Sequence, residues 1–157
     1  MRKFLVIFIL IAIVLFVGGA VNFFNFRLTR NQSQPDGKIF KVGSAVFQVE
    51  IADTIEKHAT GLSGRNELEK GRGMLFVFDQ PIIPGFWMKG MKFPLDIVWI
   101  SNGKVIGLEE NLPPDHTLSP ATYSPPKPVD MVLEINAGAS EESKINVGDK
   151  TVLESRK

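Results

Sequence analysis

Residues 94–108, PLDIVWISNGKVIGL, indicate how this chain folds. The apolar run LDIVWI (95–100) is followed by the turn SNGK (101–104) and by a second run, VIGL (105–108). Asn-Gly is the pair that two-residue type I′ hairpin turns prefer, because both central residues need a positive φ. The stretch therefore predicts an antiparallel β-hairpin in the interior of the chain.

Short runs with strand character continue on both sides of this hairpin. IFKV (39–42) and AVFQVEI (45–51) alternate apolar and polar residues, whereas MLFVF (74–78) is typical of a central strand covered on both faces. The other predicted strands are FWMK (86–89), DMVLEI (130–135) and KTVL (150–153). This pattern predicts a mainly β (α+β) fold, a small antiparallel β-barrel or sandwich with one short helix.

The one clear helix is predicted over DTIEKHATG (53–61), with Asp53 as its N-cap and Gly61 at its end. Three apolar residues have helical spacing and are expected to pack on the sheet: Ile55, Ala59 and Leu62. His58 lies off this stripe, so we expect it to face solvent.

The first 30 residues have a different character from the rest. Residues 4–21 contain no polar side chain, and a helix of about twenty apolar residues can cross the hydrocarbon core of a bilayer. We predict one N-terminal transmembrane helix in residues 1–30, with a cleaved signal peptide as the alternative. Residues 31–38 form a polar linker, and residues 39–157 form the β-rich domain.

The distribution of charge bears on location and on partners. Four of the 18 Lys and Arg residues but none of the 17 Asp and Glu residues lie in residues 1–30, so the remainder has a net charge of −3. This acidic remainder lacks the basic surface that nucleic acid requires, and we expect no nucleic-acid partner. A short N-terminal tail before a single span normally stays inside, which places the domain outside the cytoplasm.

Asp96 is the charge inside the most apolar internal stretch, LDIVWI. A buried carboxylate needs a cation, several N–H donors or a proton. Two interpretations follow: Asp96 accepts backbone hydrogen bonds from the adjoining turn and fixes the fold, or it lies at the floor of a ligand pocket.

Three further residues are candidates for a ligand site with Asp96. Trp87 and Lys89 lie on one face of the predicted strand 86–89, where an aromatic ring beside a cation suits stacking on a sugar or an aromatic ligand. The candidate partners of the Asp96 carboxylate are Lys89, Arg65 and Arg72, and the sequence does not decide among them. For Trp87, the structural alternative is that it closes the barrel.

Signatures of known chemistry are few in this sequence. There is no cysteine, no HExxH or paired-histidine motif, no GxSxG elbow and no phosphate-binding glycine loop. We therefore predict no metal and no cofactor. The stretch 111–128 contains six prolines and is expected to be a long loop.

Several motifs, in order, resemble the family called domain of unknown function 192. They are GLSGR (61–65), GRGMLFVF (71–78), FWMKGMKFPLDIVWI (86–100), GKVIGLEENLPP (103–114), VLEINAG (132–138) and INVGD (145–149). The matched positions are Gly61, Leu62, Arg65, Gly73, Met74, Phe76, Phe78, Phe86, Trp87, Met88, Lys89, Pro94, Leu95, Asp96, Glu134, Gly138, Gly148 and Asp149. The chain departs from the family at Ser63, where Met is usual, and at Gly90-Met91, where Asn-Thr is usual.

The resemblance implies a small β-rich domain, often secreted or membrane-anchored, without an established activity. Our leading hypothesis is a membrane-anchored extracytoplasmic module that binds a small polar or carbohydrate-like ligand, or is structural. One alternative is a hydrolase with Asp96 as general acid or base. Another is a domain that binds a protein partner through its proline-rich loop.

Overall fold

The structure is a computed structural model that describes residues 37–154. The predicted transmembrane anchor in residues 1–30 and nearly all of the linker lie outside the described residues. Within 37–154, neither helix is long and apolar enough to span a bilayer.

The described residues form nine strands and two short helices. In chain order these are β1 (Lys38–Val42), β2 (Ala45–Ala52), α2 (Ile55–Thr60), β3 (Arg72–Ile82), β4 (Phe86–Trp87), β5 (Leu95–Ser101), β6 (Lys104–Leu112), β7 (Thr122–Tyr123), β8 (Val129–Asn136), α3 (Ala139–Glu142) and β9 (Thr151–Glu154). The prediction of a mainly β fold is confirmed.

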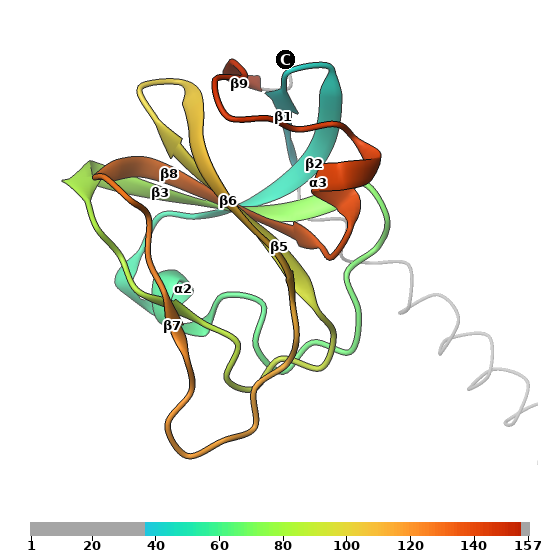
Figure 1. Ribbon diagram of the computed structural model, residues 1–157, viewed down its shortest axis with the longest axis vertical. Helices are drawn as coiled ribbons and strands as arrows, with labels where there is room; N and C mark the ends of the chain where they lie inside the picture. Colours follow the sequence, from blue (N-terminus) through green and yellow to red (C-terminus); the bar gives the residue numbers. More distant parts are fainter. Residues whose placement is uncertain (1–36, 155–157) are drawn as a thin grey trace, which may run out of the picture. The chain divides into compact units, whose positions relative to one another are not determined.

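Seven strands form one curled sheet in the order β6-β5-β8-β3-β2-β1-β9 (Figure 1). At one end the two edges meet, because Val105 N donates to Asp149 O at 2.9 Å and Thr151 N donates to Gly103 O at 2.8 Å. These bonds satisfy edge groups that would otherwise be exposed. The sheet is therefore a half-barrel that is joined at the end of the β5–β6 hairpin.

The prediction that this sheet is antiparallel throughout is wrong at one pair. β2 and β3 pair in parallel, with Val49 opposite Gly73 and Ile51 opposite Leu75. The intervening residues 53–71 include α2 and return the chain to the end of the sheet where β2 began. Parallel neighbours need a crossover of this kind, whereas a tight turn can join only antiparallel strands.

The β5–β6 hairpin forms as predicted. Asn102 and Gly103 have φ values of 50° and 69°, as a type I′ turn requires. β5 then pairs with β6 on one side and β8 on the other. The hairpin thus supplies both an edge strand and a central strand of the sheet.

Both faces of the central strands β3, β5 and β8 are covered by apolar side chains. On one face the buried cluster is Ala52, Leu62, Met74, Phe76, Met88, Met91, Leu95, Ile97, Trp99, Leu112, Val129 and Val132. On the other face, inside the curl, it is Phe40, Val42, Phe47, Val49, Leu75, Val98, Ile100, Val105, Leu133, Ile135 and Ile145. The two-sided burial predicted for residues 74–78 is confirmed for Met74 to Phe76, and it explains why six consecutive residues of β5 are buried.

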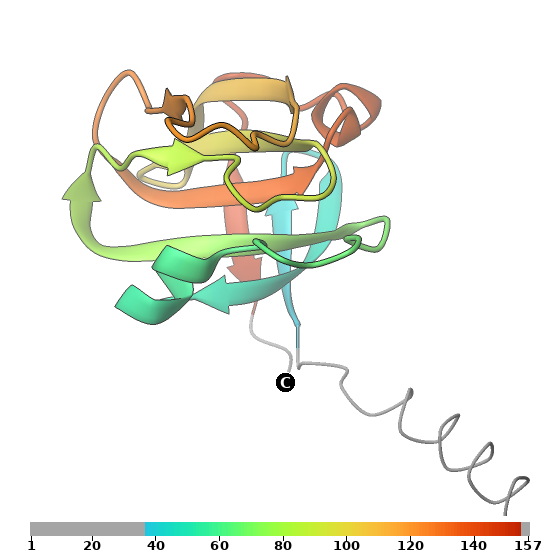
Figure 2. The same ribbon diagram turned by 90° about the horizontal axis from the view of Figure 1, so that it is seen from below.

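A second layer covers the outer face of β3 and β8. The proline-rich stretch is not wholly loop, since β7 lies within it and pairs with β4, Phe86 opposite Tyr123. Figures 1 and 2 show that α2 and this β4–β7 ribbon lie on the same side of the sheet. The space between α2 and β4 is where the candidate site forms.

Candidate functional site

α2 presents a different face to the sheet from the one predicted. Its N-cap is Thr54, whose Oγ1 accepts a hydrogen bond from Lys57 N at 3.3 Å, so the helix begins one residue later than an Asp53 cap would place it. Ile55 is 82% exposed, and of the predicted apolar stripe only Leu62, beyond the helix end, is buried.

His58 takes the inward position, contrary to the prediction that it faces solvent. Its Nε2 lies 2.9 Å from Ala52 O, and its ring centroid lies 4.9 Å from that of Phe78 and 5.9 Å from that of Phe76. The imidazole therefore forms part of the wall between α2 and β3.

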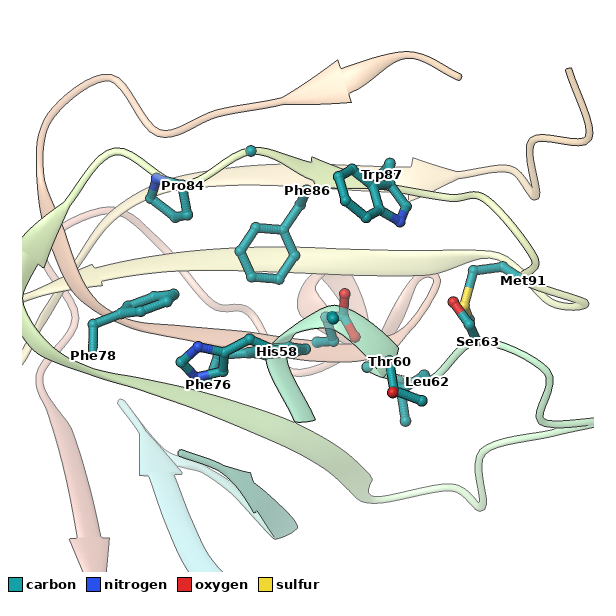
Figure 3. A pocket seen from close by; sticks show the side chains of 14 residues that line it. His58, Thr60, Leu62, Ser63, Phe76, Phe78, Pro84, Phe86, Trp87 and Met91 are labelled. Atoms are coloured by element: carbon teal, nitrogen blue, oxygen red, sulfur yellow. The ribbon is translucent and has the colours of Figure 1, made fainter. Parts of the chain in front are cut away.

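An open cleft of about 110 Å³ lies between α2 and β4, above β3 and β8 (Figure 3). Its lining residues are His58, Ala59, Thr60, Gly61, Leu62, Ser63, Phe76, Phe78, Pro84, Gly85, Phe86, Trp87, Met91 and Glu134. Phe86 meets Phe76 edge to face at 4.9 Å and Trp99 at 5.5 Å. These contacts hold the aromatic wall in place without a ligand.

Gly61 brings the end of α2 close to the base of this cleft. Its φ of 50° is in the left-handed region, and a Cβ built there would lie 3.4 Å from the Phe76 ring and 3.9 Å from Glu134 Oε2. Glycine therefore ends the helix and lets its last turn approach the carboxyl group.

Glu134 is the one ionisable acid among the described residues that line the cleft, and it is only 6% exposed. It lies on β8 opposite Met74 of β3 and Ile97 of β5, neither of which offers a side-chain donor. Its Oε2 is buried without a hydrogen-bond partner in the described part of the chain. Such a group is costly to bury, and a structural role would ordinarily supply it with donors.

Burial raises the pKa of Glu134 to about 8, although the positive charge of Arg65 opposes this rise. Arg65 is engaged elsewhere: its Nη1 and Nη2 donate to the two carboxylate oxygens of Glu50 at 2.6 and 2.8 Å. These hydrogen bonds lower the pKa of Glu50. Glu134 is therefore a protonated acid at neutral pH, at the base of an aromatic cleft.

The structure does not bring the four predicted site residues into one cleft. Trp87 lines it and is 48% exposed at its rim. Arg65 pairs with Glu50, and Lys89 is exposed while its carbonyl accepts from Ser63 Oγ at 3.0 Å. Asp96 is absent from the lining residues. A ligand-binding role for these four residues stays a prediction.

Asp96 is fully buried and accepts four hydrogen bonds. Its Oδ1 accepts from the backbone N–H of Asn111 at 2.8 Å and of Gly138 at 3.1 Å. Its Oδ2 accepts from Ser140 N at 2.9 Å and from Ser140 Oγ at 2.6 Å. The donors come from Asn111 in β6, from Gly138 at the N-cap of α3 and from Ser140 within α3, not from the adjoining turn. The carboxylate thus joins three separate segments.

Glu134 was not among the four residues singled out from the sequence. Its signal is the same as that of Asp96: one acid inside an apolar run, here MVLEI (131–135). As for metals, no group of three or more His, Asp or Glu side chains within residues 37–154 is arranged to hold an ion.

Comparisons with known proteins agree with this fold. The family model described as Uncharacterized ACR matches residues 38–153. A protein of unknown function from Novosphingobium aromaticivorans is 32% identical, with a TM-score of 0.67 over 73% of this chain and 83% of that one. A Sinorhizobium meliloti protein, whose description proposes a transcription regulator, is 28% identical, with a TM-score of 0.68 over 74% and 92%. No curated protein gives a significant match.

We predict that Asp96→Asn destabilises the fold by about 3 kcal/mol. Each oxygen of Asp96 accepts two hydrogen bonds, so the NH₂ group of an amide would face two donors that it cannot accept from. Denaturant unfolding, followed by the fluorescence of Trp87 and Trp99, measures the change. Asp115→Asn is the matched control, since Asp115 accepts two backbone N–H bonds in an exposed loop and should lose less. An Asp96→Asn protein as stable as the wild type would contradict a fold-fixing role.

We predict that Glu134→Gln changes how stability depends on pH. Between the ordinary pKa of 4.5 and about 8, folded Glu134 keeps a proton that the unfolded chain releases, so rising pH destabilises the wild type. This effect of Glu134 lowers the free energy of unfolding by on the order of 1 kcal/mol per pH unit within that window, and the variant lacks it.

Unfolding free energies at pH 5, 7 and 9 measure this slope. Exposed Glu67→Gln controls for the loss of one negative charge. Identical pH profiles for wild type and Glu134→Gln would show that the carboxyl is not held as a neutral acid.

Proposed function

The chain belongs to the DUF192 family, and we propose that its β-rich domain is a module that binds a small ligand in the cleft between α2 and β4. The observation that carries the proposal is the buried Glu134 carboxyl at the base of the cleft, whose Oε2 has no hydrogen-bond partner within residues 37–154. Asp96 is equally buried in the same sheet and has four donors. The contrast favours a ligand as the partner that Glu134 lacks.

The size and walls of the cleft limit what such a ligand can be. A closed apolar cavity of about 150 Å³ accommodates benzene, so an open cleft of about 110 Å³ suits one ring-sized group. Trp87 at the rim offers a face on which a sugar ring or another small ring can stack. We therefore propose a small cyclic ligand, carbohydrate-like molecules included.

The hydrolase alternative based on Asp96 has less support. Both oxygens of Asp96 are occupied by hydrogen bonds, and its exposed fraction is 0%. A general acid or base must reach the proton that it transfers, which a fully enclosed carboxylate does not. Regulation of transcription, suggested by the description of the S. meliloti protein, is not favoured by the net charge of −3 over residues 31–157.

We also propose that residues 1–30 hold this module at a membrane, with the domain outside the cytoplasm. The support is the uncharged apolar run that follows Met1-Arg2-Lys3. A site outside the cytoplasm would meet ligands from the environment.

Thermal-shift screening of the full chain against monosaccharides and small cyclic metabolites tests ligand binding. We expect at least one class to raise the melting temperature, and Trp87→Ala to weaken that ligand about threefold to tenfold through lost stacking. Val152→Ala is the control, because Val152 is also an exposed apolar side chain and does not line the cleft. A panel without any shift would argue against a binding module.

Protease added to intact cells tests the location. We expect the domain to be digested without lysis, because the predicted span leaves it outside the cytoplasm. Protection until the cells are lysed would reverse the orientation.

A further inference from the structure

Three polar side chains of the cleft can present a hydrogen-bond acceptor: His58, Ser63 and Glu134. His58 Nε2 faces the Ala52 carbonyl at 2.9 Å, and because a carbonyl only accepts, Nε2 carries a proton; in that tautomer Nδ1 is an acceptor. The Ser63 hydroxyl donates its one proton to Lys89 O at 3.0 Å, which leaves its lone pairs. Glu134 adds a carboxyl whose Oε2 has no hydrogen-bond partner in the described part of the chain. The side-chain hydrogens that remain for donation are those of the Thr60 hydroxyl, the Trp87 indole and, while it is protonated, the Glu134 carboxyl.

The electrostatic character of the cleft also favours a positive ligand. Four aromatic side chains line it, Phe76, Phe78, Phe86 and Trp87, and ring faces attract cations. No lysine or arginine is among the described residues that line it. The nearest guanidinium, Arg65, already pairs with both oxygens of Glu50. A phosphate or carboxylate ligand would find few donors here, and a cation would find acceptors and ring faces.

We infer that the cleft selects a protonated amine carried on a small ring-sized body, such as an arylalkyl- or cycloalkylammonium ion. The ammonium group would lie at the base, where Glu134 supplies the negative charge and Phe76 and Phe86 supply ring faces. The apolar body would lie outward against Trp87 and Met91. This inference rests on the proposed ligand-binding function and narrows it from cyclic molecules in general to basic ones.

Proton transfer accompanies this mode of binding. Since burial holds the pKa of Glu134 at about 8, the free protein carries a carboxylic acid, and an ammonium ligand stabilises the carboxylate. Three other charged or titratable groups are near Glu134: His58, which lines the cleft from α2, Arg65, and Glu50, which pairs with Arg65. Binding below pH 8 therefore releases a proton from Glu134 to the buffer.

Isothermal titration of the full chain in lipid nanodiscs tests the inference with two probes of nearly equal shape, benzylammonium and benzyl alcohol. We expect the wild type to prefer the amine by at least about tenfold, the size of one desolvated charge contact. In Glu134→Gln, which keeps the size of the side chain, the preference should fall below about threefold. Glu67→Gln should keep the wild-type preference.

Titration in buffers of different ionisation enthalpy supplies a second readout. At about pH 6.5 the wild type should release about one proton for each benzylammonium bound, and Glu134→Gln should release none. Unchanged amine affinity or unchanged proton release in Glu134→Gln would overturn the inference.

The two proposals fail in different ways. Equal binding of amine and alcohol, with both weakened in Trp87→Ala, would overturn the amine preference and leave the binding module standing. Absence of binding for both probes and for every compound of the screening panel would overturn both.

Discussion

The rest of the structure depends on the burial of both faces of the central strands β3, β5 and β8. One apolar cluster fills the inside of the half-barrel, and another fills the space under α2 and the β4–β7 ribbon. A charged side chain in the middle of these strands, such as Asp96 or Glu134, is therefore cut off from water whichever face it is on. Such a group must find donors, a counter-charge or a proton, because the alternatives cost several kcal/mol.

Asp96 and Glu134 meet this constraint in opposite ways. They are on neighbouring strands and opposite faces, with Asp96 beside Ile135 and Glu134 beside Ile97 in the register of β5 and β8. Asp96 receives donors from β6 and from the first turn of α3, so it ties both elements to β5. The Oε2 atom of Glu134 has no donor among the described residues, and Glu134 lines a cleft. Asp96 explains part of the stability of the fold, whereas Glu134 marks a place where the stability of the fold was not optimised.

The strands themselves could be predicted from the sequence more accurately than the neighbours with which they pair in the sheet. Uninterrupted apolar runs predicted the two-sided burial of Met74–Phe76, and Asn102-Gly103 predicted the hairpin, because both signals are local. The parallel pairing of β2 with β3 was not predicted, because contacts between residues far apart in the sequence set the crossover. In α2, six residues are too few for the apolar spacing to decide which face is inward, so Ile55 was placed inside and His58 outside.

The candidate site was only partly predictable for the same reason. Trp87 was singled out as a candidate by its type and position, and it lines the cleft. The sequence also drew attention to Asp96, but its donors are on Asn111, Gly138 and Ser140, residues 15 to 44 positions away. Glu134 gives the same local signal although its Oε2 has no donor within residues 37–154, and only the folded chain distinguishes the two acids.

The protonation of Glu134 is the property that connects the cleft, the stability and the ligand. Its direct measurement is the pH titration of the Glu134 side-chain carboxyl carbon by NMR in the ligand-free full chain. The account predicts a midpoint near pH 8, well above the ordinary value of 4.5. A midpoint near 4.5 would mean that the carboxylate has donors or water that the structure does not contain, and the case for a missing ligand would fail.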